Sequence, residues 1–554
     1  MKVNKLLALI LCAILLFSIV ACNKDSGTQG TSSAPAGESN AGSSGNTTPG
    51  GSGAASGDNG SSGSGSVSGK DTVTIGVTQD RGTLHPHSMT DLDIYGCMNG
   101  LIYEPLWYVD SDNNLVYLLA TGYEEVGPMT IRIFLREGVT FADGSEFDSE
   151  DALFSFDCWN HREGQPTIFP QLDTEASYIV DKYTIDLVLN EFTITLYNSL
   201  AIVGMFDKET YDADTIAMTP NGTGPYVIED YVVNSHLNVT RRDDYWGTPP
   251  AIKNFHFIQL KEDTQRVNAI QTGTVDMAVI PFQDVEFVQT LTNVNVDIAP
   301  STTSRAINFN ISPYSVFYEN RDARLAVAYA IDRDSIVKAA YYNYVPKSRL
   351  PSSQFCYDID DRFFDLGAYG HGYDPELARE LAISSGLVDK EITFLNNGTA
   401  HLVVASEIIQ ANLRDIGVTC NVLTLDLGSW SRYVFDETMF DMLIGGNNNG
   451  GFLCSSNLKY MVGSMSAETW VNYQWEGHDR AFYIMLDAPV PLTSIHDIAE
   501  RTELNLEITK MVVDEMLYFN VVDEVTCWAV STDLRGDPKN SAGGMGIWRN
   551  LYWD

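Results

Sequence analysis

The stretch LREGVTFADGSEFDSEDALFSF, residues 135–156, carries six carboxylates and ends in a run of phenylalanines. Paired carboxylates of this kind could supply an acid and a base for catalysis. The spacing favours a structural role instead. Asp143 and the glycine after it are typical of a tight turn. Asp148 with Asp151 three residues later matches a capping box at the start of a helix. We predict packing roles for the aromatic residues around this helix: Phe147, Phe154 and Trp159.

The composition describes a large, folded and acidic chain. It has 554 residues, 44% of them hydrophobic, and a formal net charge of −39. That length suits two to four domains. Nucleic-acid binding is excluded because phosphates require a surface rich in Lys and Arg, and adhesion to anionic lipid is disfavoured for the same reason.

The first 21 residues resemble a bacterial lipoprotein signal peptide. Lys2 and Lys5 precede an apolar run of 15 residues, too short to span a membrane but suited to a signal sequence. The run ends in IVAC, residues 19–22, which resembles a lipobox. We therefore predict cleavage before Cys22 and lipid on its sulfur; the alternative is an ordinary cleavage site that happens to precede a cysteine.

Residues 22–69 are predicted to form the lipidated cysteine and a flexible tether. The segment is dominated by Gly and Ser and has almost no large apolar residue, so it cannot bury a core. A coil of this length has a root-mean-square reach of roughly 35–40 Å. The folded body is expected to begin near Thr72, where dense apolar alternation starts.

The cysteines give no connectivity. Eight occur along the whole chain, widely spaced and without a CxxC or Cys/His metal pattern. An even number outside the cytoplasm is compatible with disulfides, but the spacing selects no pairing.

The pattern of the folded body predicts an α/β structure. Helical patterns that end at glycine are followed by short apolar strands, as in 264–280, where a helix is expected to stop at Gly273, and in 401–425, with a stop at Gly417. Further helix starts are predicted at Asp374, which precedes a proline, and at Asp332 or Asp334. Such units indicate layered α/β structure rather than a sandwich or a bundle.

Several segments in order resemble the family 5 extracellular solute-binding proteins, the receptors of ATP-driven importers for oligopeptides, dipeptides and related solutes. YEPL at 103–106, the stretch at 135–156, NGTGPY at 221–226 and RRDDYWG at 241–247 match family segments. AIQTGTVDMAV, INFN, RLAVAYAIDRDSI, YDPELAREL and LRDIGVTCNV follow in family order. The resemblance covers about 450 residues.

The resemblance implies a two-lobed, type II periplasmic-binding-protein-like α/β body with an inserted third subdomain. Chain crossings near 303 and 517 would form a hinge. The implied parts are lobe 1 (70–108, 223–303 and 518–554), its inserted subdomain (109–222) and lobe 2 (304–517).

The implied function is capture of a peptide or related small solute and its delivery to the permease subunits of an ABC importer. Such a receptor faces outside the cytoplasm, at the cell surface or in the periplasm, and needs neither catalysis nor a cofactor. The lipobox adds the expectation of a lipid anchor, and we expect a monomer. Two alternatives remain: the same importer role for an oligosaccharide or other amine-free solute, and a lipid-anchored extracellular hydrolase. Ser456 and Lys459 match an SxxK motif without its partner motifs, so that match is attributed to chance.

The family places part of its ligand site in the segment FDMLIGGNNNGGF, residues 440–452. Asn447, Asn448 and Asn449 offer amide donors and acceptors there, although an ordinary Asn/Gly turn explains them equally well. Asn308 lies near a family ligand position, with core packing as its alternative, and Trp430 could stack on a solute or serve as a half-buried structural aromatic.

One departure bears on the solute. Peptide-binding members often carry an Asp that pairs with the peptide's α-amino group, and that position falls near Gly450 here. No carboxylate occurs between Leu443 and Cys454. A peptide receptor would need another acid. Metal binding through His85 and His87 is disfavoured because two histidines do not complete a site.

Overall fold

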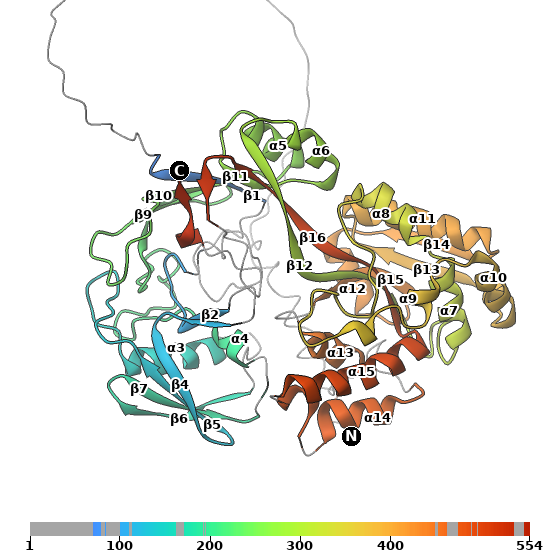
Figure 1. Ribbon diagram of the computed structural model, residues 1–554, viewed down its shortest axis with the longest axis horizontal. Helices are drawn as coiled ribbons and strands as arrows, with labels where there is room; N and C mark the ends of the chain where they lie inside the picture. Colours follow the sequence, from blue (N-terminus) through green and yellow to red (C-terminus); the bar gives the residue numbers. More distant parts are fainter. Residues whose placement is uncertain are drawn as a thin grey trace, which may run out of the picture.

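The computed structural model describes a body in two halves joined by two long strands (Figure 1). The described residues are 70–78, 84, 100–109, 114–161, 171–191, 193, 196–448, 453–462, 475–488, 490–495, 497–536 and 548–554. The predicted signal peptide, Cys22 and the tether lie outside them. None of the described helices combines the length and apolar character needed to cross a membrane.

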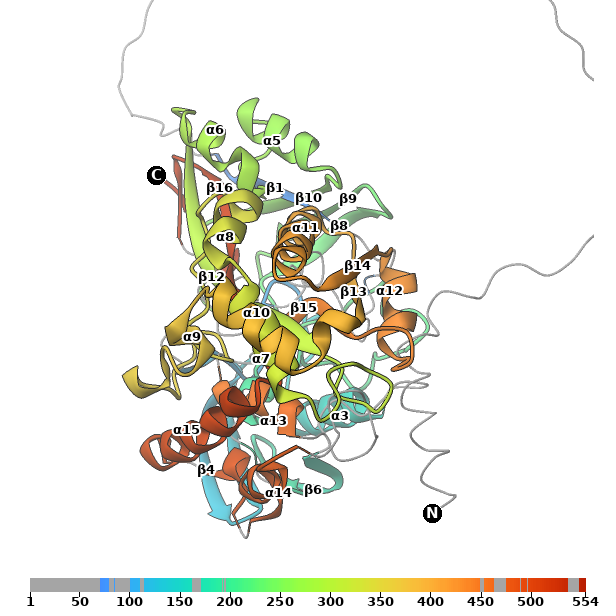
Figure 2. The same cartoon turned by 90° about the vertical axis from the view of Figure 1, so that its right-hand side faces the viewer.

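One ten-stranded sheet passes through both halves, in the order β14-β13-β15-β12-β16-β11-β1-β10-β9-β8. Its centre is the antiparallel pair of β12 and β16, which cross from one half to the other (Figures 1 and 2). β1 is parallel to β10 and β11, and β13 is parallel to β14 and β15, whereas β15 is antiparallel to β12. The bounds are β1 Thr72–Val77, β8 Tyr226–Val232, β9 His236–Arg241, β10 Asn254–Gln259, β11 Met277–Val279, β12 Val294–Phe309, β13 Glu391–Asn396, β14 Thr419–Thr424, β15 Met442–Asn448 and β16 Tyr518–Ser531.

The first half also contains a four-stranded antiparallel sheet, β4-β5-β7-β6, packed against α3. These elements and the short strands near them are β2 Trp107–Val109, β3 Leu115–Tyr117, β4 Ala120–Gly127, β5 Thr130–Leu135, α3 Ser149–Asn160, β6 Leu172–Asp181, β7 Thr184–Leu189, α4 Leu196–Leu200, α5 Asp263–Gln271, η1 Phe282–Asp284, α6 Val285–Gln289, β17 Leu534–Arg535, η7 Trp548–Asn550 and β18 Tyr552–Trp553. The chain end pairs β17 with β18 and so belongs to the first half.

The acidic stretch is a turn and a helix cap, as predicted. Asp143 accepts hydrogen bonds from the backbone and hydroxyl of Ser145. Asp148 is the N-cap of α3, and a complete capping box joins it to Asp151. Phe147 and Trp159 are fully buried, and Phe154 packs against the same core. The predictions of structural roles for this stretch are therefore confirmed.

The GTGPY segment owes its glycines to a close approach of two backbones. Gly224 donates to Ile102 O, and Tyr226 donates to Leu101 O. A Cβ on Gly224 would overlap Leu101 O, and one on Gly222 would overlap Ile102 O. Only glycine permits this contact, which seats the YEPL segment beside the start of β8.

Glu104 of YEPL is hydrogen-bonded to polar residues of two distant segments. It is fully buried and accepts from Tyr245 Oη at 2.7 Å, Trp246 Nε1 at 3.2 Å and Arg549 Nη1 at 2.7 Å. Burial raises the pKa of Glu104, and the Arg549 charge opposes that rise. The cluster ties the DYWG segment and the chain end to the first half.

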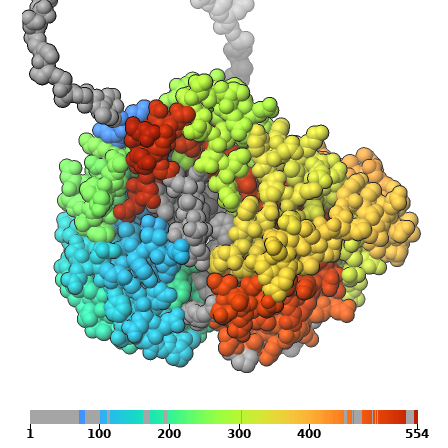
Figure 3. Space-filling view, in the orientation of Figure 1, coloured from blue at the N-terminus to red at the C-terminus, as the bar shows by residue number. Residues whose placement is uncertain are grey.

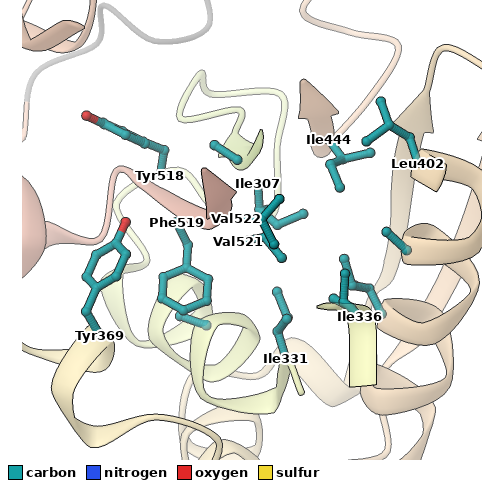
Figure 4. Packing of buried hydrophobic residues seen from close by; sticks show 14 of the residues in the cluster. Ile307, Ile331, Ile336, Tyr369, Leu402, Ile444, Tyr518, Phe519, Val521 and Val522 are labelled. Atoms are coloured by element: carbon teal, nitrogen blue, oxygen red, sulfur yellow. The ribbon is translucent and has the colours of Figure 1, made fainter. Parts of the chain in front are cut away.

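The second half packs helices on its part of the sheet. They are α7 Arg321–Ala330, α8 Arg333–Tyr341, η2 Asp361–Phe363, α9 Ala368–His371, α10 Pro375–Ser384, η3 Leu387–Asp389, α11 Ala400–Asp415, α12 Leu427–Val434, α13 Cys454–Val462, α14 His478–Phe482, η5 Tyr483–Asp487, η6 Leu492–Ser494 and α15 Ile498–Glu515. In its core, Ile307 and Ile444 of the strands lie near Ile331, Ile336 and Leu402 of the helical layer (Figure 4).

The local signals predicted for helix ends hold in both halves. Asp332 caps α8 and Asp374 caps α10, which has proline at its first position. Gly273 and Gly417 follow their helices with φ of +68° and +88°, a conformation that glycine adopts without strain. The α/β prediction is thus confirmed. The described cysteines are free thiols: Cys158, Cys356, Cys420, Cys454 and Cys527.

Candidate functional site

Asn308 and Trp430, predicted separately from the sequence, meet over Gly445 of β15. A Cβ built on Gly445 would lie 3.7 Å from Asn308 Nδ2 and 3.9 Å from Trp430 Cζ2. Both are ordinary van der Waals distances, so an amide from β12 and an indole from α12 lie against the same point of the strand. Trp430 Nε1 is buried and has no hydrogen-bond partner among the described residues.

The pairing of β12 with β15 decides which side chains share this face of the sheet. Asn308 pairs with Leu443, and Ser304 pairs with Asn447, without a register shift between them. Directly opposed residues on neighbouring strands point to the same face, and residues two apart do so along each strand. Asn308, Ser304, Asn447 and Gly445 therefore lie on one face.

Asn447 uses its side chain inside the protein. It is 8% exposed and donates from Nδ2 to Asn520 Oδ1 at 3.3 Å. Asn520, itself fully buried, donates to Pro351 O at 2.8 Å. The main chain of Asn448 lies in β15, while Asn449 lies outside the described residues.

A β-bulge in β16 adds an acid to the same face. Ser304 pairs with Asp523 and Ala306 with Asn520, with a register shift between the two positions. In a regular strand, residues three apart point to opposite faces; the extra residue of a bulge restores them to one face. Asp523 and Asn520 consequently both lie beside the polar side chains of β12 and β15.

Asp523 is held by neutral donors. Its Oδ1 accepts from Ser304 Oγ and Ser348 Oγ, each at 2.7 Å, and its Oδ2 accepts from the Gln354 backbone at 3.3 Å. The carboxylate is fully buried. Burial raises the pKa of Asp523, and the hydrogen bonds from Ser348 and Ser304 oppose that rise.

Sequence reasoning missed Asn520 and Asp523. The sequence YFNVVDEV, residues 518–525, contains the signal: Asn520, Asp523 and Glu524 interrupt a run typical of a buried strand. Their convergence with Asn447 depends on the bulge, which the sequence pattern does not indicate.

The acidic group of Asp151, Asp207 and Glu209 has ligand atoms within 4.8 Å of one another. Burial raises the pKa of Asp151 to about 6. Asp151 accepts from two backbone groups, and Asp207 accepts from Ser145 Oγ at 2.8 Å. These bonds account for the group as local structure. His85 and His87 lie outside the described residues.

The chain has recognisable relatives. The family described as bacterial extracellular solute-binding proteins, family 5 middle, matches residues 114–467. The glutathione-binding protein GsiB of Salmonella typhimurium is 24% identical over 488 residues, which cover 85% of this chain and 92% of that protein.

Solved structures share the fold. The ABC transporter substrate-binding protein CtaP from Listeria monocytogenes has a TM-score of 0.73 at 19% identity and covers 88% of this chain and 99% of its own. The oligopeptide-binding protein AppA from Bacillus subtilis, in complex with a nonapeptide, has a TM-score of 0.69 at 16% identity and covers 87% of this chain and 99% of its own. The type II two-lobed fold expected from the sequence is confirmed by these matches.

Proposed function

The chain belongs to the bacterial extracellular solute-binding proteins of family 5, and on that premise we propose that it captures a peptide or related small solute between its halves and delivers it to the permease of an ABC importer. Its relatives are solute-binding proteins rather than enzymes. The names of the relatives support a peptide-like solute, because glutathione and a nonapeptide are both bound by proteins of similar sequence or fold.

The observation that carries the proposal is the way the halves are joined. β12 and β16 run through both halves, and their ladder shifts register between Pro300 and Ser304. Pro300 cannot donate to the ladder. An interrupted ladder at the crossing is a place where the strands can bend, as hinge closure around a solute requires. Figure 3 shows a notch between the halves at the lower edge of the molecule.

We assign the parts around this hinge as follows. Lobe 1 comprises residues 70–108, 223–303 and 518–554, with 109–222 as its inserted subdomain, and lobe 2 comprises 304–517. Asn308, Trp430 and the Asn447–Asn449 segment are the proposed solute contacts on lobe 2. Support for Asn308 and Trp430 comes from their meeting over Gly445.

The unpartnered indole nitrogen supplies a direct prediction. Trp430 Nε1 is buried without a partner among the described residues, so a solute carbonyl that accepts from it would gain a hydrogen bond without loss of one in the protein. Trp430→Phe should weaken solute binding about fivefold or more, because a net hydrogen bond contributes about 1 kcal/mol. Calorimetry with the isolated solute measures this. Trp553→Phe, in the first half, is the matched control, and equal affinities for both variants would contradict the assignment.

We further propose that the protein is a lipoprotein cleaved before Cys22, tethered by residues 22–69 and working as a monomer. The IVAC lipobox and the Gly/Ser-rich segment support this. Cells fed a radiolabelled fatty acid should label the wild-type chain and leave Cys22→Ala unlabelled. Equal labelling of both would contradict lipidation at this residue.

The proposed function is tested by finding what the protein carries. A tag-free body starting at residue 70 is purified, denatured, and its released small molecules are identified by mass spectrometry. Short peptides support the peptide assignment. Sugars or another amine-free solute would support the importer role with a different cargo. Cleavage of a peptide or glycan during incubation would instead support the hydrolase alternative.

A further inference from the structure

We propose, on the basis of the peptide-importer function above, that Asp523 of β16 binds the ammonium group of the solute. The segment between Leu443 and Cys454 carries no carboxylate, so a peptide's α-amine needs an acid from elsewhere. Asp523 lies on the sheet face that also carries Asn308, Gly445 and Asn447, as the strand registers show.

Asp523 differs from its neighbour Glu524 in the charge of the groups around its carboxylate. Its carboxylate accepts from two hydroxyls and one backbone N–H, and none of the ion pairs formed among the described residues includes it. The adjacent Glu524 differs: it pairs with Arg305 at 2.6 Å and with His401 at 3.3 Å. A buried acid is costly without a counter-charge. An ammonium group from the solute would supply that charge to Asp523.

The guanidinium of Arg333 makes its contacts with other groups. Arg333 interacts with Asp523 electrostatically, but it donates to the carbonyls of Ser348 and Tyr369 and lies 4.9 Å from the centre of the Phe519 ring. It therefore does not occupy the acceptor positions of the Asp523 carboxylate.

Gln354 marks the position that the ammonium would take. Its side-chain amide lies close enough to Asp523 to lower the pKa of that acid, yet its Nε2 is buried and forms no well-aligned hydrogen bond among the described residues. The residue as a whole is half-buried. Rotation of this side chain away from the carboxylate would leave Oδ2 with the long bond from the Gln354 backbone, 3.3 Å. Oδ2 is thus the oxygen that receives the amine, while Ser304 and Ser348 keep Oδ1 in place.

The experiment compares peptides that differ only in the amine. An equimolar mixture of tripeptides and their N-acetylated forms is offered to the tag-free body, and the bound forms are counted by native mass spectrometry. The wild type should prefer free amines about tenfold or more, because hydrogen bonds between charged groups are worth about 1.5–3 kcal/mol. Asp523→Asn should lose that preference and still bind the acetylated forms.

Asp358→Asn is the matched control. Asp358 is equally buried in the second half, but its neighbours include Arg501, 3.7 Å away, and its replacement should leave the amine preference intact. The assignment is overturned if Asp523→Asn keeps the preference for free amines. It is also overturned if the variant loses binding of both peptide forms equally, because that result indicates a structural role for Asp523. If the wild type binds both forms equally well, the assignment of Asp523 is overturned but the peptide-binding function is not. Binding of neither form overturns the peptide function as well.

A measurement on the wild type covers the case in which Asp523→Asn does not fold. Because burial raises the pKa of Asp523, the acid holds a proton more tightly than a free aspartate does, and an incoming ammonium would displace that proton. Calorimetry in two buffers of different ionisation enthalpy should therefore detect proton release with a free-amine peptide and none with its acetylated form. Equal proton release with both peptides would overturn the assignment.

Discussion

Two fully buried carboxylates, Glu104 in the first half and Asp523 on β16, differ in the charge of the groups that donate hydrogen bonds to them. Glu104 receives a guanidinium from Arg549, together with Tyr245 and Trp246. Asp523 receives two serine hydroxyls and a backbone N–H. The first carboxylate has its counter-charge within the protein and joins segments that are far apart in the chain. The second has no ion-pair partner within the part of the chain that the structure describes, and it lies on the face shared with the proposed solute contacts.

The difference shows which acid serves stability and which is available for function. Removing the partner of a paired buried charge destabilises the protein, because the remaining charge is buried without a counter-charge. An acid surrounded by neutral donors can instead be replaced by a neutral group at little cost in stability. Changes around Glu104 should therefore act on unfolding, and changes at Asp523 should act on binding.

The largest effect is expected at Arg549. Arg549→Met leaves Glu104 buried without its counter-charge and should lower the free energy of unfolding by about 3–5 kcal/mol. Urea denaturation followed by tryptophan fluorescence measures the loss. The double variant Glu104→Gln with Arg549→Met removes both charges and should recover most of the stability. A double variant no more stable than Arg549→Met would contradict the pairing.

The glycine beside this cluster should have the next largest effect. Gly224→Ala places a Cβ against Leu101 O and should cost about 2–3 kcal/mol, as overpacking commonly does. Gly122→Ala is the control, because a Cβ there meets nothing within 4 Å. Equal unfolding midpoints for the two variants would show that the YEPL and GTGPY backbones do not approach as described.

Asp148, the N-cap of α3, is a third carboxylate whose effect on stability can be compared with those of Glu104 and Asp523. Asp148 caps α3 by accepting the Glu150 N–H at 2.8 Å. Asp148→Ala should lower stability by about 1 kcal/mol, the usual value of an N-cap, and Asp148→Asn should lower it much less. Urea denaturation of both variants decides the point, since equal losses would mean that the charge and not the cap matters.

Asp523→Asn should have the smallest effect on unfolding, about 1 kcal/mol or less, because its serine partners can donate to or accept from an amide. Its pH dependence is the diagnostic. A raised folded-state pKa means that the folded protein holds the proton more tightly, so this group's contribution to stability falls as pH rises from its unfolded pKa through its folded pKa. Stability of the wild type relative to the variant should fall as pH rises above about 4, the pKa of an unfolded aspartate, and a difference that rises with pH would contradict the raised pKa.

Local features of the fold could be predicted from the sequence because their causes lie within a few residues. The caps at Asp148, Asp332 and Asp374 and the stop at Gly273 all follow from turn and helix-end chemistry. The family segments gave the two-lobed fold through resemblance rather than through any single pattern.

Features that depend on pairing between distant strands could not be predicted. Glu104 meets a partner 445 positions away, and Asp523 reaches the site face only because β16 has a bulge opposite Arg305. Asn308 and Trp430 were proposed from resemblance and from residue type, but their approach to the same strand position, Gly445, depends on tertiary structure that includes the β12–β15 register.

The central claim is that the two halves close on a solute about the crossing of β12 and β16. Small-angle X-ray scattering of the tag-free body, with and without the solute identified by mass spectrometry, tests it most directly. Closure predicts a smaller radius of gyration in the bound state than in the free state. An unchanged radius of gyration at saturation, with binding verified in the same sample by calorimetry, would contradict it.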